Sequence, residues 1–197
     1  MMQSHTCNDF IIVKGGASAH SFDETTHILN LQCDDYYEGL SEKIFTVCKY
    51  ISSTPHFNKY THFCKVDDDI TVKKLLVPKL VSDYWGKLFP GHPGSPRWHY
   101  GKCHNANFNN KEYTGPWVPW CAGGTGYVIS RKALEIIAAD TTLYERIVKD
   151  INENSVLHRL YFIYEDVYIA YTLLTHGINP TPASQLHQYL YSPDHKY

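Results

Sequence analysis

Short apolar runs of strand-like composition alternate with segments of helical spacing along this chain, and this alternation constrains its fold more than any other feature. The strand-like runs are Phe10–Val13, His27–Leu31, Tyr60–Val66, Tyr84–Phe89 and Tyr127–Ile129. The segments with helical spacing or composition cover residues 39–53, 72–81, 131–138 and 165–176. Such alternation predicts an α/β domain whose ligand site lies at the carboxyl ends of strands.

Local signals refine several of these elements. The Phe10–Val13 run stops at two glycines, as a buried strand does, and the apolar segment 160–164 predicts a strand-to-helix junction. Ser130 is expected to cap the 131–138 helix, and Gly177 to end the last helix. The stretch from Trp85 to Trp120 is rich in Gly and Pro and is predicted to be a long surface loop. The expected buried helical faces are Leu40, Ile44, Val47 and Ile51 in the first helix, and Val167, Tyr171 and Leu174 in the last.

Charge and hydropathy exclude several classes of protein. The 197 residues carry 18 Lys and Arg against 20 Asp and Glu, so no positive field exists to hold nucleic acid. No apolar run approaches the ~20 residues that cross a bilayer, and Met1–Asp9 lacks the features of a secretion signal. We therefore expect one soluble domain over residues 1–197, cytoplasmic by default. The six cysteines contain no C-x-x-C pair, which favours free buried thiols over a zinc site.

Three adjacent aspartates, Asp67, Asp68 and Asp69, follow the strand-like run that ends at Val66. Neighbouring carboxylates repel one another unless water or a cation relieves the repulsion. In an extended backbone Asp67 and Asp69 would face the same side, where both could contact one Mg²⁺ or Mn²⁺, while Asp68 would point elsewhere. The alternative is an acidic turn exposed to solvent.

Two further segments carry residues that could bind a ligand or transfer a proton. Between Trp117 and Ser130, glycines allow close backbone approach and tryptophans offer flat faces to a sugar ring, although a tight turn with core aromatics is the alternative. Glu165 and Asp166 begin the last helix, where the helix dipole favours carboxylates without any reference to catalysis. The same field would keep Asp166 ionised and able to accept a proton from a bound hydroxyl.

Taken in order, these segments resemble the β1,3-galactosyltransferases and β1,3-N-acetylglucosaminyltransferases, with the Fringe enzymes as more distant relatives. Residues 65–69 are similar to the K-x-D-D-D motif of that family, and residues 165–168 to its E-D-V-Y motif. Residues 97–100 resemble its K-W-Y segment, and residues 117–130 its Y-P-x-Y-C-x-G-x-G-Y-V-x-S stretch. Residues 35–43 resemble its D-x-Y-x-N-L-T-x-K segment, with Gly39 in place of Asn.

The resemblance implies a GT-A fold, in which helices flank a mixed central sheet. It implies inverting transfer of a hexose from a nucleotide-sugar donor, usually linked to UDP, to a glycan acceptor, with Mn²⁺ or Mg²⁺. Asp69 would ligate the metal, with Asp67 and Asp68 around metal and donor, and Asp166 would be the catalytic base. His187, or else His195, would complete the metal shell. The remaining residues expected at the donor are Lys43, Trp98, Trp117, Trp120, Gly123, Gly124, Gly126 and Glu165.

Two departures from the family leave alternatives open. Family members have an R-x-T-W-type segment and a first donor-binding strand before the run at Phe10–Val13, and neither is found here. A transferase-like binder of sugars or nucleotide sugars without turnover is therefore the second hypothesis, and a metal-dependent hydrolase is the third. Family members also commonly carry a membrane anchor and work in the Golgi lumen, which would be the location if this chain is an excised domain.

Overall fold

The computed structural model describes residues 5–6, 9–69, 71–72, 76–77, 82–91, 96–141, 160–183 and 190–191. A four-stranded sheet with the order β12-β8-β11-β5 lies at its centre. Its strands are β5 (His62–Lys65), β8 (Tyr84–Gly86), β11 (Tyr127–Ser130) and β12 (Thr181–Pro182). β11 is antiparallel to β5 and β8, whereas β12 is parallel to β8, so the sheet is mixed. The predicted α/β class is confirmed at this level.

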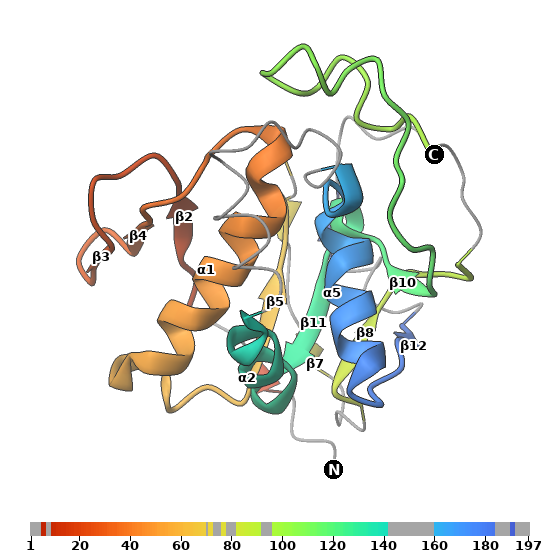
Figure 1. Cartoon of the computed structure of the whole chain (residues 1–197). Coiled ribbons are helices and arrows are strands. Elements are labelled where there is room, and N and C mark those ends of the chain that lie inside the picture. Colours follow the sequence, from red (N-terminus) through yellow and green to blue (C-terminus); the bar gives the residue numbers. More distant parts are fainter. Residues whose placement is uncertain are drawn as a thin grey trace.

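Three helices pack against one another in front of this sheet in the view of Figure 1. They are α1 (Leu40–Ser53), α2 (Arg131–Ala139) and α5 (Glu165–Thr175). α5 lies deepest, because Val167, Ile169, Ala170 and Leu173 are all 0% exposed. Burial of so much apolar surface on one helix makes α5 the centre of the hydrophobic core.

Smaller sheets complete the architecture. Strands β2 (Ile12–Lys14), β3 (Ser21–Asp23) and β4 (Ile28–Asn30) form a sheet of order β2-β4-β3. Three antiparallel pairs join β1 (His5–Thr6) to β7 (Leu76–Val77), β9 (Leu88–Phe89) to β10 (Trp120–Cys121), and β6 (Thr71–Val72) to β13 (Leu190–Tyr191). The short helical turns η1 (Tyr37–Gly39) and η2 (Pro55–Phe57) flank α1.

The predicted helix ends at residues 131 and 175–177 are confirmed, and their signals are visible in the backbone. The Ser130 hydroxyl accepts a hydrogen bond from the N–H of Ala133 at 3.1 Å, which caps α2. Gly177 follows α5 with φ of +77°, the left-handed conformation that commonly ends a helix. The bounds of α1 also agree with the prediction for residues 39–53.

The predicted buried faces of α1 and α5 are wrong in part. In α1 the buried apolar residues are Phe45, Cys48 and Ile51, whereas Leu40, Ile44 and Val47 are half-buried. The buried stripe is rotated because the large Phe45 ring turns toward the core. In α5, Tyr171 and Leu174 are half-buried, because the surrounding elements cover the helix on most sides and no single stripe is selected.

The helix predicted over residues 72–81 is wrong where the structure describes it. Positions 72 and 76–77 belong to strands β6 and β7, and the remaining positions lie outside the described residues. Val72 and Leu76 pair with strands from the two ends of the chain. Pairing with distant partners overrides a weak local preference for helix.

Two predicted strands also need correction. The strand expected at Phe10–Val13 begins at Ile12, and Phe10 and Ile12 are 64% and 47% exposed because β2 lies at the end of its sheet. Residues 160–164 form no strand: Leu160 and Tyr161 are helical, and Phe162 lies in a turn. This segment is apolar because it enters the core directly, with Leu160 0% exposed.

The segment 96–119 is irregular and largely exposed, as predicted for a surface loop, but four of its side chains are buried. His99 and Phe108 are 0% and 1% exposed, and Cys103 and Tyr113 are also buried. Its backbone is held by Glu38, whose carboxylate accepts hydrogen bonds from the N–H groups of His104 at 3.1 Å and Asn105 at 2.8 Å. The predicted loop is therefore anchored to the core through these four buried side chains.

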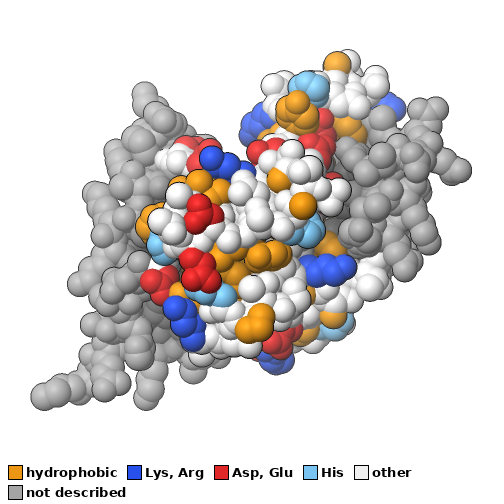
Figure 2. Space-filling view, turned by 90° about the vertical axis from the view of Figure 1, so that its left-hand side faces the viewer, with side chains coloured by type: hydrophobic (Ala, Val, Ile, Leu, Met, Phe, Trp, Pro, Cys, Tyr) orange, Lys and Arg blue, Asp and Glu red, His pale blue; other side chains and the backbone are white. Residues whose placement is uncertain are grey.

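The described cysteines are free thiols, as predicted. Cys48, Cys103 and Cys121 are buried, while Cys33 and Cys64 are half-buried, and Cys7 lies outside the described residues. Figure 2 shows acidic, basic and apolar side chains interspersed over the described part of one face. Among the helices that the structure describes, none combines the length and the apolar character needed to span a membrane.

Substitution of Ser130 tests the junction between β11 and α2. The Ser130 hydroxyl caps α2 and also donates to Asp83 Oδ1 at 2.7 Å. Ser130→Ala should therefore lower the free energy of unfolding by about 1–2 kcal/mol, measured by urea denaturation. Ser53→Ala, at the exposed last residue of α1, should change it by less than about 0.5 kcal/mol. Equal effects of the two variants would contradict the capping role.

Candidate active site

The register of the central sheet brings together three segments that are far apart in the sequence. Tyr127, at the start of β11, pairs with Lys65, at the end of β5. Because the strands are antiparallel, the turn η3 (Gly123–Thr125) that precedes β11 meets the chain that follows β5. The first residue of α5, Glu165, reaches the same point through an ion pair with Lys65. The acidic strand end, the glycine turn and the helix start therefore form one candidate site.

The Lys65 ammonium joins these three segments. It donates to Asp67 Oδ1, to Glu165 Oε1 at 2.9 Å and to the carbonyl oxygen of Gly123 at 3.5 Å. Burial lowers the pKa of Lys65, but the carboxylates of Glu165 and Asp67 more than offset it, so the pKa lies above its usual value. Lys65 is therefore charged at neutral pH.

Glu165 is enclosed by protein groups. Its side chain is only 6% exposed, and while one carboxylate oxygen faces Lys65, the other accepts the Tyr127 hydroxyl hydrogen at 2.9 Å. A buried carboxylate is stable only when its charge is paired and its oxygens accept hydrogen bonds. Lys65 and Tyr127 provide both.

Asp166, the next residue, is half-buried and is fixed by backbone groups. Its Oδ2 accepts the Gly123 N–H at 2.9 Å, and its Oδ1 accepts the Val167 N–H at 2.8 Å. Burial, and then the adjacent charge of Glu165, raise the pKa of Asp166 to about 6, against the opposing effects of the Gly123 hydrogen bond and Lys65. A carboxylate that titrates near neutral pH can serve as a general base.

The glycines of the turn differ in the space that a side chain would have and in their backbone conformation. A Cβ at Gly123 would lie 2.5 Å from Glu165 Oε1 and 3.3 Å from Asp166 Cβ, so position 123 has no room for a side chain. A Cβ at Gly124 would lie 3.7 Å from Asp67 Oδ2, which is an ordinary contact. Gly126 adopts a φ of +79°, which other residues rarely adopt.

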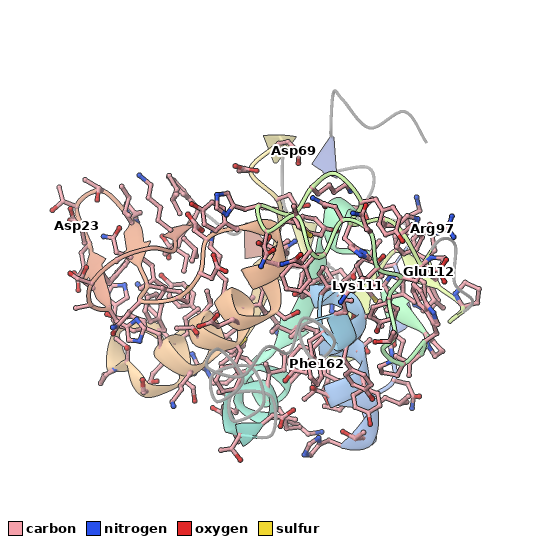
Figure 3. The ribbon with its side chains drawn as sticks, turned by 45° about the horizontal axis from the view of Figure 1, so that its top comes forward. Asp23, Asp69, Arg97, Lys111, Glu112 and Phe162 are labelled. Carbon is pink, nitrogen blue, oxygen red and sulfur yellow. The ribbon has the colours of Figure 1, made fainter. Side chains whose placement is uncertain are left out.

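The aspartate triplet has a different backbone from the one predicted. Asp67 is half-buried beside Lys65, whereas Asp68 and Asp69 are exposed and form a turn. The alternation expected of an extended backbone therefore does not apply, because the chain leaves the sheet after Lys65. Figure 3 shows Asp69 on the segment between β5 and β6, well away from Asp23 on the small sheet.

The carboxylates suit a hard cation in chemical type, but they do not form a closed ligand set. Within the described residues there is no group of three His, Cys, Asp or Glu side chains arranged to hold a metal ion. His187 and His195, the expected further ligands, lie outside the described residues. A cation at Asp67–Asp69 would need oxygen atoms from a bound ligand or from water.

The three expected pocket tryptophans form a cluster, but they differ in exposure. Ring centroids lie 5.7 Å apart for Trp98 and Trp117, and 5.5 Å apart for Trp117 and Trp120. Trp120 is 1% exposed and stacks on Phe89, so it supports the cluster from inside. Trp98 is 36% exposed, and its backbone N–H donates to the Tyr164 hydroxyl at 3.0 Å, next to the start of α5. Trp98 and the half-buried Trp117 are the members that a ligand could reach.

Lys43 and Tyr127 are two residues whose place in the structure differs from what the sequence indicated. Lys43 lies on α1, and its ammonium donates to Asp35 at 2.5 Å. Lys43 is therefore paired with a residue that does not belong to the group of contacts around Lys65. Tyr127 joins the site although the sequence indicated only a strand residue there. A buried tyrosine hydroxyl needs a hydrogen-bond partner, and a tyrosine directly after a glycine turn is the signal that could have identified it.

Two neighbouring glycines provide a matched test of the site's packing. Gly123→Ala should destabilise the protein by roughly 1–3 kcal/mol, because Glu165 or the turn must move to admit the methyl group. Gly124→Ala should change stability by less than about 0.5 kcal/mol, because its contact with Asp67 is ordinary. Urea denaturation of both variants measures the difference, and a Gly123→Ala variant as stable as Gly124→Ala would show that the turn is not packed as described.

Comparison with known proteins identifies the family to which the chain belongs. The sequence model of a family described as Galactosyltransferase matches residues 18–184, a range that includes the strand end, the glycine turn and the start of α5. None of the curated proteins gives a significant match. The family match spans well over half of the chain and confirms the resemblance found in the sequence. The chain therefore belongs to the galactosyltransferase family and is a glycosyltransferase, which transfers a sugar from a donor to an acceptor.

Proposed function

We propose that this glycosyltransferase moves a hexose from a UDP-linked donor to a hydroxyl of a glycan acceptor, with inversion and with the help of Mn²⁺ or Mg²⁺. The observation that carries this proposal is the Asp166 carboxylate, fixed by the Gly123 N–H at 2.9 Å and with its pKa raised to about 6. We also assign the domain to the GT-A type, which agrees with its mixed sheet and helices.

Asp166 is the proposed general base. It accepts the proton of the acceptor hydroxyl as that oxygen forms a bond to the anomeric carbon of the sugar. The bond from the anomeric carbon to the diphosphate breaks on the opposite face, and the diphosphate oxygen keeps the electron pair. Attack and departure on opposite faces invert the anomeric centre, so a single base is sufficient.

The carboxylates of Asp67, Asp68 and Asp69 are the proposed ligands of the divalent cation. Their oxygens are of the hard type that Mg²⁺ and Mn²⁺ prefer, and they follow directly after the strand that carries Lys65. When bound, the cation neutralises charge on the leaving diphosphate. We retain His187 as a proposed further ligand, with His195 as the alternative.

The sugar-contacting surface is proposed to include Trp98 and Trp117, whose accessible rings lie beside the start of α5. Flat indole faces pack well on the C–H faces of sugars. Gly124 and Gly126 allow the donor to approach Asp67 closely, and Lys43 remains a proposed donor contact. Trp120 supports these rings from the core, where it is 1% exposed.

Asp166→Asn tests the proposed base. The substitution keeps the shape but removes the basic site, so turnover should fall by about 10² or more while donor affinity stays near normal. Turnover is measured as release of UDP from a panel of UDP-hexoses in the presence of Mn²⁺ and acceptor glycans. Wild-type turnover should also fall as the pH drops through about 6, because Asp166 then becomes protonated. Wild-type rates in Asp166→Asn would rule out the assignment, and donor binding without UDP release in the unmodified protein would favour a binding domain.

Asp69→Ala and Asp67→Ala test the proposed cation site. Both should abolish the dependence of UDP binding on Mn²⁺, as measured by titration calorimetry, because each removes a carboxylate from the cation. Asp23→Ala is the matched control, since Asp23 lies on the small sheet, far from Asp69 in Figure 3. If Asp69→Ala bound Mn²⁺ and UDP like the Asp23→Ala control, the cation would have to bind elsewhere.

A further inference from the structure

The carboxylate of Glu165 is unusual for a residue at a proposed substrate site, because both of its oxygens are already bound by the protein. Lys65 Nζ lies 2.9 Å from Oε1, and the Tyr127 hydroxyl lies 2.9 Å from Oε2. With 6% of its surface exposed, Glu165 presents little to a ligand. A residue in this state acts through its neighbours.

The neighbour that matters is the peptide of Gly123. Its N–H donates to Asp166 at 2.9 Å, and its carbonyl oxygen faces Lys65 Nζ at 3.5 Å. Glu165 packs so closely on Gly123 that a Cβ there would lie 2.5 Å from Oε1. Glu165, Lys65, Gly123 and Asp166 therefore form a closed ring of contacts, which the covalent bond between residues 165 and 166 completes.

We propose that Glu165 is a positioning residue: through Lys65, Tyr127 and the peptide of Gly123, it fixes the orientation and electrostatic surroundings of Asp166, and it does not contact the sugar donor. This inference rests on the proposed role of Asp166 as the base. It replaces the expectation from the family resemblance that Glu165 binds the donor.

The charges around Asp166 determine in which direction its pKa should shift when Glu165 is changed. The charge of Glu165 raises the pKa of Asp166, and that of Lys65 lowers it. Other titratable groups among the described residues that interact electrostatically with Asp166 are Tyr37, Tyr84, Tyr113, Tyr164 and Cys121. Burial raises the pKa of each of these groups, so they are neutral near pH 6. Removal of the Glu165 charge should therefore make Asp166 more acidic.

Glu165→Gln is the variant that tests the inference. An amide has the same shape and can still accept the Tyr127 hydrogen bond, but it carries no charge. The titration midpoint of Asp166 should move to lower pH, as measured by NMR of ¹³C-labelled aspartate carboxyls in EDTA, with Asp166→Asn used for assignment. Turnover should fall by roughly tenfold with little change in the donor KM, and the acidic limb of its pH profile should move the same way. Glu135→Gln, an exposed glutamate on α2, should alter none of these quantities.

Tyr127→Phe is the second variant, and it guards against misfolding of Glu165→Gln. It removes one hydrogen bond from Glu165 and keeps its charge, so turnover should fall while the Asp166 midpoint stays in place. An unchanged Asp166 midpoint in Glu165→Gln, or wild-type turnover in Tyr127→Phe, would overturn the positioning role. A raised donor KM with normal kcat in Glu165→Gln would show instead that Glu165 binds the donor. If the NMR midpoint moved but the pH profile of turnover did not follow, the positioning role would stand and Asp166 would not be the base.

Discussion

The site depends on one buried ion pair, between Lys65 and Glu165. Taking each charge out of water costs several kcal/mol, and this cost is recovered only if partner charges and hydrogen bonds are well placed. The 2.9 Å contact, the Tyr127 hydroxyl and the neighbouring Asp67 meet that condition. Displacement of β5 or α5 would leave a charge without its partner, and displacement of β11 would remove the Tyr127 hydrogen bond from Glu165. The pair therefore holds the strand end, the glycine turn and the helix start together before any substrate binds.

The parts of the fold that could be predicted are those with local causes. The ends of α2 and α5 follow from a hydroxyl cap at Ser130 and a left-handed glycine at Gly177, each of which acts within a few residues. The strands β6 and β7 were missed because they pair with the two ends of the chain, and no local pattern encodes that pairing. The burial of four side chains in the 96–119 segment has the same origin, since their core contacts come from other elements.

The same division applies to the site. Asp67, Gly123 and Asp166 could be identified because they belong to short motifs, and the register of β5 with β11 then brings them together. The sequence could not reveal that Glu165 is enclosed on both oxygens or that Trp120 faces the core, because burial depends on which elements pack together. The motifs thus indicated which residues gather at the candidate site, whereas the burial and the contacts of each residue depend on how the elements pack.

The anchoring of the 96–119 segment also bears on how the chain folds. Glu38 holds the backbone of His104 across 66 residues, and the N–H of Trp98 meets the hydroxyl of Tyr164 across another 66. Contacts that close loops of this length are formed slowly, because the entropy of a large part of the chain is lost before they contribute. The aromatic cluster next to Asp166 therefore becomes ordered only when elements that are far apart in the sequence have come together. Catalytic competence should therefore lag behind the appearance of secondary structure.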